Sequence, residues 1–200
     1  MSSRLLFVRH GRTVANAAGL LLGRADPPLD DTGRQQARRL AGVLATGAFG
    51  EVVRVVSSPL ARTRETAAAL GVPVEVDDRF VELDYGEFDG VPLVDVPVAT
   101  WDAWRRDVHF RPPGGETLAE LGERVRVACE ELLADVPESG TVVVVSHVSP
   151  IKAAAAWAMG VDDSVSWRMH LDPASVTTVA VRGGRPVLSG FNATAHLLNG

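Results

Sequence analysis

The sequence predicts an α/β fold, a three-layer αβα sandwich built around a mostly parallel central sheet. Three apolar runs, of the kind found in strands buried on both faces, occur at residues 5–8, 52–56 and 141–145. Segments with apolar side chains at helical spacing alternate with these runs, an order typical of α/β domains. A chain of 200 residues with 46% hydrophobic residues can bury a core of this size. We therefore expect one domain over residues 1–200.

The first half of the chain supplies two of these strands and two helices. Residues 5–8 are expected to be the central strand, and residues 32–46 carry the first helical pattern. Ser58-Pro59 is typical of a helix start, because serine caps free backbone amides and proline is preset for the first helical position. This start places Arg62 in the first turn of the second helix.

The second half continues the alternation of helices and strands. A long helix is predicted over residues 117–135, capped by the turn at residues 112–115. Ser149-Pro150 repeats the helix-start pattern and opens a helix that ends near Gly160. Residues 175–181 and 186–189 are predicted to be late edge strands.

Residues 87–113 have no clean period and are predicted to be an insertion that covers the site, as a lid or specificity segment. Pro92 and Pro97 interrupt this stretch, and a short helix is expected around residues 101–106. Trp101 and Trp104 are three residues apart and would share one face of that helix. We expect them to pack the lid onto the domain rather than to stack on substrate.

Polar side chains directly follow the ends of two predicted strands. Arg9-His10-Gly11 comes after the first run, and Ser146-His147 comes after the third. Ligands of parallel sheets bind beyond the carboxyl ends of the strands, so neighbouring strands would bring His10 and His147 into one crevice. Arg62 would join them at a helix N-terminus, whose amides and dipole favour an anion. Two imidazoles and two guanidiniums in one pocket make phosphate chemistry the leading prediction.

The composition argues against several other classes of protein. A net charge of -5 gives no basic surface for nucleic acid or for anionic membranes, so neither is expected as a partner. No run approaches the roughly 18 apolar residues that span a bilayer, and the start lacks the pattern of a signal peptide. These features predict a cytoplasmic protein. The single cysteine, Cys129, falls in a helical pattern and is expected to be a small buried side chain.

The ordered set of site residues resembles the histidine phosphatase (phosphoglycerate mutase-like) superfamily over nearly the whole chain. The Arg-His-Gly triplet alone is a weak signal, whereas the full order is specific. The further matches are Asn16, Gly23, residues 29–37, Ser57-Ser58-Pro59-Leu60 before Arg62, Thr66-Ala67, Glu82 before Tyr85-Gly86, and Pro113-Gly114-Gly115-Glu116.

The resemblance implies a metal-independent phosphomonoester hydrolase without a cofactor. Neutral His10 would attack phosphorus to form a phosphohistidine, while its other ring nitrogen donates to a backbone carbonyl. Arg9 and Arg62 would bind phosphoryl oxygens through their forked donors, and His147 would donate to an equatorial oxygen. Glu82 would protonate the leaving oxygen and later activate water.

Three more groups are placed at the phosphoryl group by the resemblance: Asn16 as a donor, Gly23 as a point of close backbone approach, and the backbone at Val148. The family often has glycines after the second histidine, whereas this chain has Val148-Ser149-Pro150, so a slightly different backbone path is expected. Asp84, two residues after Glu82, stays open as an alternative acid.

The segment from Arg12 to Asn16 replaces the Glu-Ser-x-Trp-Asn sequence typical of cofactor-dependent phosphoglycerate mutases. Together with the short chain, this difference favours the phosphatase branch, which includes alpha-ribazole phosphatases and broad-specificity acid phosphatases acting on small phosphorylated metabolites. Three alternatives stay open: a mutase, a metal hydrolase built on His10, His147 and Glu82, and a phosphate-recognition module without turnover. The natural substrate and the choice between monomer and homodimer are not decided.

Overall fold

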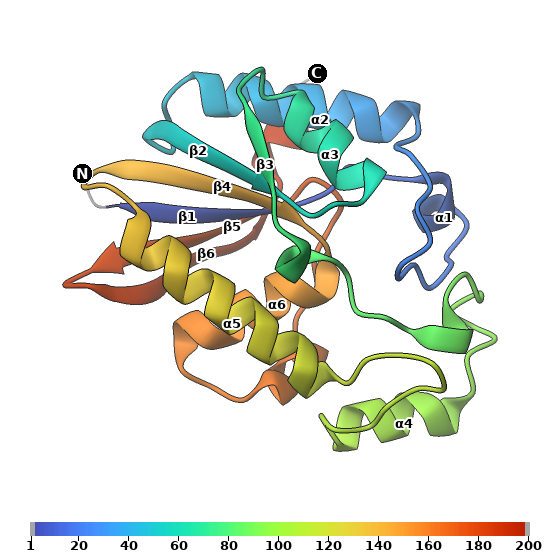
Figure 1. Cartoon of the computed structure of the whole chain (residues 1–200). Helices are drawn as coiled ribbons and strands as arrows, with labels where there is room; N and C mark the ends of the chain where they lie inside the picture. The colour runs from blue at the N-terminus through green and yellow to red at the C-terminus, as the bar shows by residue number, and fades with distance from the viewer. Residues whose placement is uncertain (1–2, 199–200) are drawn as a thin grey trace.

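A six-stranded sheet forms the centre of the computed structural model, which describes residues 3–198 (Figure 1). The strands follow the order β3-β2-β4-β1-β5-β6 across the sheet. β1 to β4 run parallel, whereas β5 pairs antiparallel with β1, and β6 with β5. Their bounds are β1 Arg4–Arg9, β2 Glu51–Ser57, β3 Val74–Val76, β4 Gly140–Ser146, β5 Val176–Arg182 and β6 Arg185–Ala193. The predicted α/β fold with a mostly parallel sheet is confirmed.

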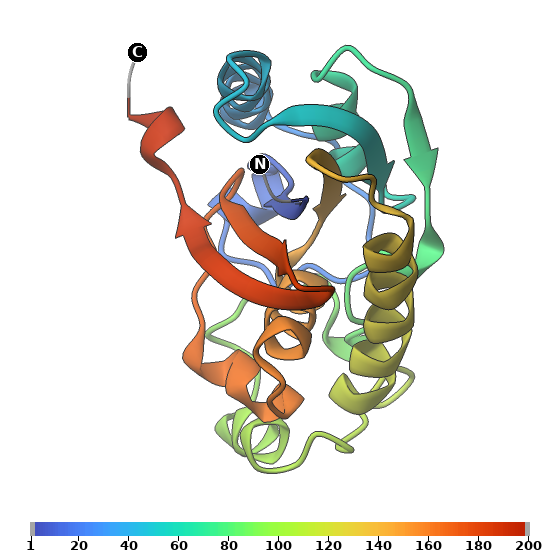
Figure 2. The same ribbon diagram turned by 90° about the vertical axis from the view of Figure 1, so that its left-hand side faces the viewer.

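Helices cover both faces of this sheet, which explains the unbroken apolar runs in its central strands. Helices α2 (Asp31–Ala45) and α3 (Ala61–Ala68) lie on one face, and α5 (Leu118–Asp135) and α6 (Val148–Met159) on the other. Figure 2 shows α2 above the sheet and α5 and α6 below it. Successive strand residues alternate between the two layers of core. Leu5, Phe7, Val142 and Val144 pack on the α5–α6 side, whereas Leu6, Val8, Val143 and Val145 pack on the α2–α3 side.

The strand predictions need two corrections. β5 is an interior strand between β1 and β6, so the prediction that residues 175–181 form an edge is wrong, whereas β6 does lie at an edge. The opposite edge is β3, which the sequence did not indicate. β3 has three residues and is largely exposed, so it gives no buried apolar run to detect.

The predicted helix starts are also partly wrong. α3 begins at Ala61 without a side-chain cap, and α6 begins at Val148 directly after His147. Thr117 caps α5 in a capping box with Glu120, rather than the preceding turn.

Register brings the two predicted strand-end histidines to the same edge of the sheet. Arg9 of β1 lies opposite Ser146 of β4, so His10 and His147 both follow at the next position. Ser57 of β2 lies opposite Val145, and the Ser58 amide donates to the Val145 carbonyl. The carboxyl ends of three neighbouring parallel strands therefore converge on one site.

The segment 87–113 extends beyond the sheet, at the lower right of Figure 1. Its only α-helix among the described residues is α4 (Val98–Arg106), longer than the expected residues 101–106. Trp104 is buried and contacts the rings of Tyr85, Phe88, Phe110 and Trp167. The packing role expected for Trp104 is therefore confirmed.

The remaining helical segments are short. They are α1 Val14–Ala17, η1 Asp78–Phe80, η2 Gly86–Phe88, η3 Asp163–Arg168 and η4 Ala195–Leu197. Of the helices in residues 3–198, none has the length and hydrophobicity needed to cross a membrane.

Candidate active site

A cleft of about 400 Å³ opens at the carboxyl ends of β1 and β4. Its volume lies at the small end of the range of metabolite sites, which is roughly 300–1,000 Å³. Polar groups from β1, the Glu82 segment and α6 meet apolar side chains from the loop 19–22, the segment 87–113 and the segment after η3. The cleft is lined by Arg9, His10, Asn16, Gly19, Leu20, Leu21, Leu22, Glu82, Tyr85, Leu93, Trp101, Val148, Lys152, Trp167, Met169, His170, Leu171 and Pro173.

His10 is buried and presents one free ring nitrogen to this cleft. Its Nδ1 lies 2.7 Å from the Gly11 carbonyl oxygen. Because a carbonyl only accepts, Nδ1 carries the proton, and Nε2 keeps its lone pair. Burial, with the positive charges of Arg9 and Arg62, holds the pKa of His10 well below its usual 6.5. The imidazole is therefore neutral at pH 7, with the tautomer that the sequence predicted.

Arg9 lines the cleft and keeps donors for a ligand. Its Nη1 donates to the Leu171 carbonyl at 2.6 Å, while its buried Nε has no hydrogen-bond partner in residues 3–198. Burial lowers the pKa of this guanidinium below its ordinary value, and the charge of Glu82 opposes the shift. A guanidinium remains charged at any working pH, so its unpaired donor favours an anion in the cleft.

Arg62 is fully buried and is held by the chain on three sides. Nη1 donates to the Ala25 carbonyl and Nη2 to the Gly23 carbonyl, both at 2.7 Å, and Nε donates to Nδ1 of His147 at 3.2 Å. A guanidinium has five N–H groups, so two remain for a ligand. Arg62 therefore brings a fixed positive charge to His10 and His147, although its side chain does not itself line the cleft.

His147 lies against His10, with ring centroids 5.2 Å apart. Arg62 can act only as a donor, so Nδ1 of His147 is the acceptor and carries no proton. The proton of the neutral ring therefore lies on Nε2, which donates to Oγ of Ser58 at 2.7 Å. Burial, followed by the charge of Arg62, lowers the pKa of His147 well below 6.5. The ring is neutral and has one N–H donor, which Ser58 engages in this structure.

Glu82 lines the cleft and also caps helix α6. Its Oε1 accepts from the amides of Leu83 and Ser149, at 2.8 and 3.1 Å, and its Oε2 accepts from the Val148 amide at 3.1 Å. The free amides at a helix start need acceptors, and a carboxylate there is favoured by the helix dipole. These contacts explain why α6 needs no Ser149 cap.

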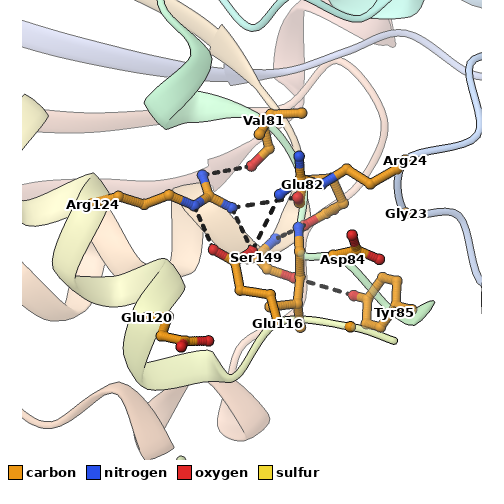
Figure 3. Close-up of polar contacts among 12 residues, drawn as sticks. Gly23, Arg24, Val81, Glu82, Asp84, Tyr85, Glu116, Glu120, Arg124 and Ser149 are labelled. Carbon is orange, nitrogen blue, oxygen red and sulfur yellow. Dashed lines mark hydrogen bonds and ion pairs between the residues drawn. The ribbon is translucent and has the colours of Figure 1, made fainter. Parts of the chain in front are cut away.

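The segment that carries Glu82 is braced from helix α5. Arg124 donates to the Val81 carbonyl at 2.8 Å and to the Glu116 carboxylate at 2.8 and 2.9 Å (Figure 3). The Tyr85 hydroxyl lies 3.1 Å from Oγ of Ser149. Asp84, the alternative acid, accepts from the Gly86 amide and does not line the cleft. The position of Glu82 therefore favours it over Asp84.

The other three residues predicted to contact the phosphoryl group, Asn16, Val148 and Gly23, differ in their positions relative to the cleft. Asn16 lines the cleft, and its Oδ1 caps α1 together with Thr13, while its Nδ2 makes no hydrogen bond within residues 3–198. Val148 lines the cleft, and its amide is bound by Glu82. Gly23 does not line it; a Cβ there would approach Tyr85 and the Leu83 carbonyl to 2.9 and 3.0 Å.

Two polar residues of the site were missed by the sequence analysis. Ser58 was interpreted as a helix cap, whereas its hydroxyl accepts from His147. Lys152 lies in an alanine-rich helix, where a single charge usually points to solvent, so no local pattern marks it. Of the other histidines, His109 is exposed and outside the cleft, while His170 is exposed and lines it.

The alternative of a metal hydrolase requires a cluster of metal ligands. Within the described part of the chain, no group of three or more His, Cys, Asp or Glu side chains is arranged to hold an ion. Cys129 is buried in the core, and burial raises the pKa of its thiol above the ordinary value. It therefore has the structural role that the sequence predicted.

Comparison with known proteins agrees with this geometry. The family model of the histidine phosphatase superfamily (branch 1) matches residues 5–194. The solved structure of mycobacterial glucosyl-3-phosphoglycerate phosphatase Rv2419c with VO3 is 32% identical, with a TM-score of 0.85, and the match covers 96% of this chain and 99% of that one. The chain belongs to the histidine phosphatase superfamily, so the family resemblance seen in the sequence is confirmed.

Two curated relatives show how far the likeness extends. Phosphoserine phosphatase 1 of Hydrogenobacter thermophilus is 34% identical over an alignment of 204 positions, which covers 97% of this chain and 94% of that protein. Bifunctional protein Rv2228c of Mycobacterium tuberculosis is 37% identical over 182 residues. That match covers 88% of this chain, which spans about half (49%) of that relative's length.

Proposed function

We propose that the protein is a phosphomonoester hydrolase that acts through a phosphohistidine on Nε2 of His10. The observation that carries this proposal is the fixed tautomer of His10. A neutral imidazole, with its proton held on the Gly11 side, offers a lone pair to the cleft beside the unpaired donor of Arg9. An uncharged nucleophile avoids the repulsion that an anion would meet at a phosphoryl dianion.

The reaction divides into two displacements. Nε2 of His10 attacks phosphorus, the bond from phosphorus to the ester oxygen breaks, and the acid form of Glu82 gives its proton to the leaving oxygen. Glu82 then takes a proton from water, whose oxygen attacks phosphorus and breaks the bond to Nε2. Inorganic phosphate leaves, and neutral His10 is restored.

Positive charge at the centre of the site would stabilise both transition states. Arg9 has a buried, unpaired Nε, and Arg62, buried beside His147, has two N–H groups that make no hydrogen bond within the described residues. We assign these donors to the phosphoryl oxygens. His147 has one donor, on Nε2, and a phosphoryl oxygen would compete with Ser58 for it. Asn16 would add the donor of its Nδ2, and the backbone at Gly23 would act through the carbonyl that holds Arg62.

The size of the cleft and the names of the relatives support small phosphorylated metabolites as substrates. A phosphate-release screen over sugar phosphates, phosphoglycerates, nucleotides, phosphoserine and ribazole phosphate tests this function. We expect phosphate release from at least one ester and essentially none from His10→Ala, whereas His109→Ala should behave as the wild type. If the protein binds inorganic phosphate but does not hydrolyse p-nitrophenyl phosphate at any pH from acid to neutral, the proposal is wrong.

A mutase is the nearest rival, because a phosphohistidine can pass its phosphoryl group to a second hydroxyl. Incubation with 3-phosphoglycerate and a trace of 2,3-bisphosphoglycerate separates the two functions. Hydrolysis predicts release of inorganic phosphate, whereas rapid isomerisation without phosphate release would favour the mutase.

A further inference from the structure

The chain contains 19 arginines and a single lysine, and that lysine lies in the catalytic cleft. Lys152 stands on α6 four residues after Val148, so the two side chains share one face of the helix. Both residues line the cleft, together with His10 and Glu82. The proposed chemistry gives Lys152 no part.

Lys152 is half-buried, and its ammonium group is unpaired within the described part of the chain. It makes no hydrogen bond or ion pair with any residue between 3 and 198, and the negative charge of Glu82 and the positive charge of Arg9 both act on it. Burial lowers its pKa from the ordinary 10.5. A partly desolvated cation without a partner is unfavourable, so an anion beside it would be bound favourably.

This cation is additional to those around the phosphoryl group. Arg9 and Arg62 already match the two charges of a phosphomonoester, and both are pinned to backbone carbonyls. Lys152 contributes one positive charge on a flexible stem, which suits a monoanion rather than a second dianion. A carboxylate has that charge.

Two further polar residues line the cleft: Asn16, which is assigned above to the phosphoryl group, and His170, whose Nε2 lies 3.1 Å from Oδ1 of Asp172. Most of the remaining lining is apolar and suits the carbon skeleton of a small metabolite. Leu20 and Leu93 line the cleft, as do Trp101 and Trp167, whose ring centroids lie 6.2 Å apart. None of these side chains can neutralise an anion. A carboxylate on the alcohol part of the substrate therefore has Lys152 as its fitting partner.

We propose that Lys152 binds a carboxylate on the substrate, so that the enzyme selects phosphate monoesters of small hydroxy acids. This inference rests on the proposed function, because it assumes that the phosphoryl group lies at His10. Lys152 is then a specificity-determining residue, and the reaction releases a free hydroxy acid and inorganic phosphate.

The test uses pairs of esters that differ only in the carboxylate. In sn-glycerol 1-phosphate, a hydroxymethyl group replaces the carboxylate of 3-phosphoglycerate, and phosphoethanolamine is phosphoserine without its carboxylate. The wild type should favour the acid of at least one pair by about tenfold or more in kcat/KM. Lys152→Met should remove most of that preference, mainly through KM, and Lys152→Arg should retain part of it.

Arg168→Met is the matched control, because it removes one exposed cation that does not line the cleft. It should leave the preference for the acid intact. If Lys152→Met lowers kcat/KM equally for both members of each pair, Lys152 acts on the phosphoryl group or on folding, and the proposal is wrong. A wild type without any preference for the acids would also overturn it. So would a greater dependence on Lys152 for fructose 1,6-bisphosphate, which would indicate a second phosphate.

A binding measurement separates this inference from the proposed function. Calorimetry with His10→Ala, alone and combined with Lys152→Met, compares the affinities for the same pairs without turnover. A preference for the acid that disappears with Lys152 supports the inference even if no ester is hydrolysed. Hydrolysis that depends on His10, without such a preference, would instead leave the proposed function standing and refute the role of Lys152.

Discussion

The ring of His10, the proposed nucleophile, is held by contacts from the residues before and after it. β1 ends at Arg9, and the Gly11 carbonyl takes the proton of Nδ1. Gly11 has no room for a side chain, because a Cβ there would lie 2.5 Å from the Gly33 carbonyl oxygen. The tautomer of His10 thus depends on close packing between this loop and α2.

The lowered pKa values of His10 and His147 predict that both imidazoles stay neutral in mildly acidic solution. Burial and the nearby arginines are the causes. In an NMR titration of imidazole-labelled protein from about pH 7.5 to 5.5, neither resonance should titrate near 6.5. His10→Ala and His147→Ala assign the two signals. A His10 signal with a midpoint near 6.5 would contradict the account.

The same shifts predict how stability depends on pH. As pH falls below 6.5, the unfolded chain takes up a proton at each of these positions and the folded chain does not. Their combined contribution to the free energy of unfolding should therefore decrease, by up to about 1.4 kcal/mol per pH unit for each histidine. Urea unfolding at about pH 7 and 5.5 measures the change. His10→Ala should reduce the slope, and an identical slope in that variant would exclude the effect.

Glu82→Gln should slow the cleavage of alkyl phosphates far more than that of p-nitrophenyl phosphate. An alkoxide leaves only with a proton, whereas p-nitrophenolate is stable without one, so the loss should be about 10²–10⁴ in kcat for the alkyl esters. Asp84→Asn is the control, since Asp84 bonds the Gly86 amide outside the cleft. Equal losses on both kinds of ester would argue against an acid role for Glu82.

At the scale of elements, the start of α2 fixes the loop that follows β1. A Cβ on Gly33 would lie 2.0 Å from the Arg12 carbonyl oxygen, whereas a Cβ on Gly42, in the same helix, would meet nothing within 4 Å. Gly33→Ala should therefore lower the free energy of unfolding by about 1–3 kcal/mol and reduce kcat/KM. Gly42→Ala should raise stability by about 0.5–1 kcal/mol, because alanine favours helix. Equal effects in urea unfolding would refute this packing.

The central strands and long helices could be predicted because periodicity alone specifies them. The strand-end placement of His10 and His147 followed from the same reasoning, since parallel neighbours end at one edge. The caps at the starts of α3 and α6 could not be predicted, because Ser58 binds His147 and α6 is capped by Glu82, which comes 66 residues before Val148. The capping box of α5 is a local motif instead. Lys152 was missed for a related reason: its position depends on how α6 faces the cleft.

At the scale of the whole molecule, an aromatic cluster joins the segment 87–113 to the body of the protein. Trp104 is 1% exposed, and its ring lies 5.3 Å from Trp101 and 6.5 Å from Trp167, measured between centroids. Trp101 and Trp167 both line the cleft, so Trp104 supports one of its walls. The lid function of this segment stays a prediction.

Trp104→Ala should lower the free energy of unfolding by about 3–5 kcal/mol and raise KM, because the cleft wall loses its support. Trp104→Phe should cost much less, since it keeps a ring and removes an indole N–H that has no hydrogen-bond partner in residues 3–198. Urea unfolding and steady-state kinetics provide the two measurements. An equal loss of stability in both variants would show that ring packing is not the cause.

The central claim is that His10 carries the phosphoryl group during turnover. Rapid acid-free quenching with a ³²P-labelled substrate, followed by peptide mapping, tests it most directly. We expect a transient label on His10, stable in base and labile in acid, that is absent from His10→Ala. A label on another residue, or full phosphate release without any labelled enzyme, would contradict it.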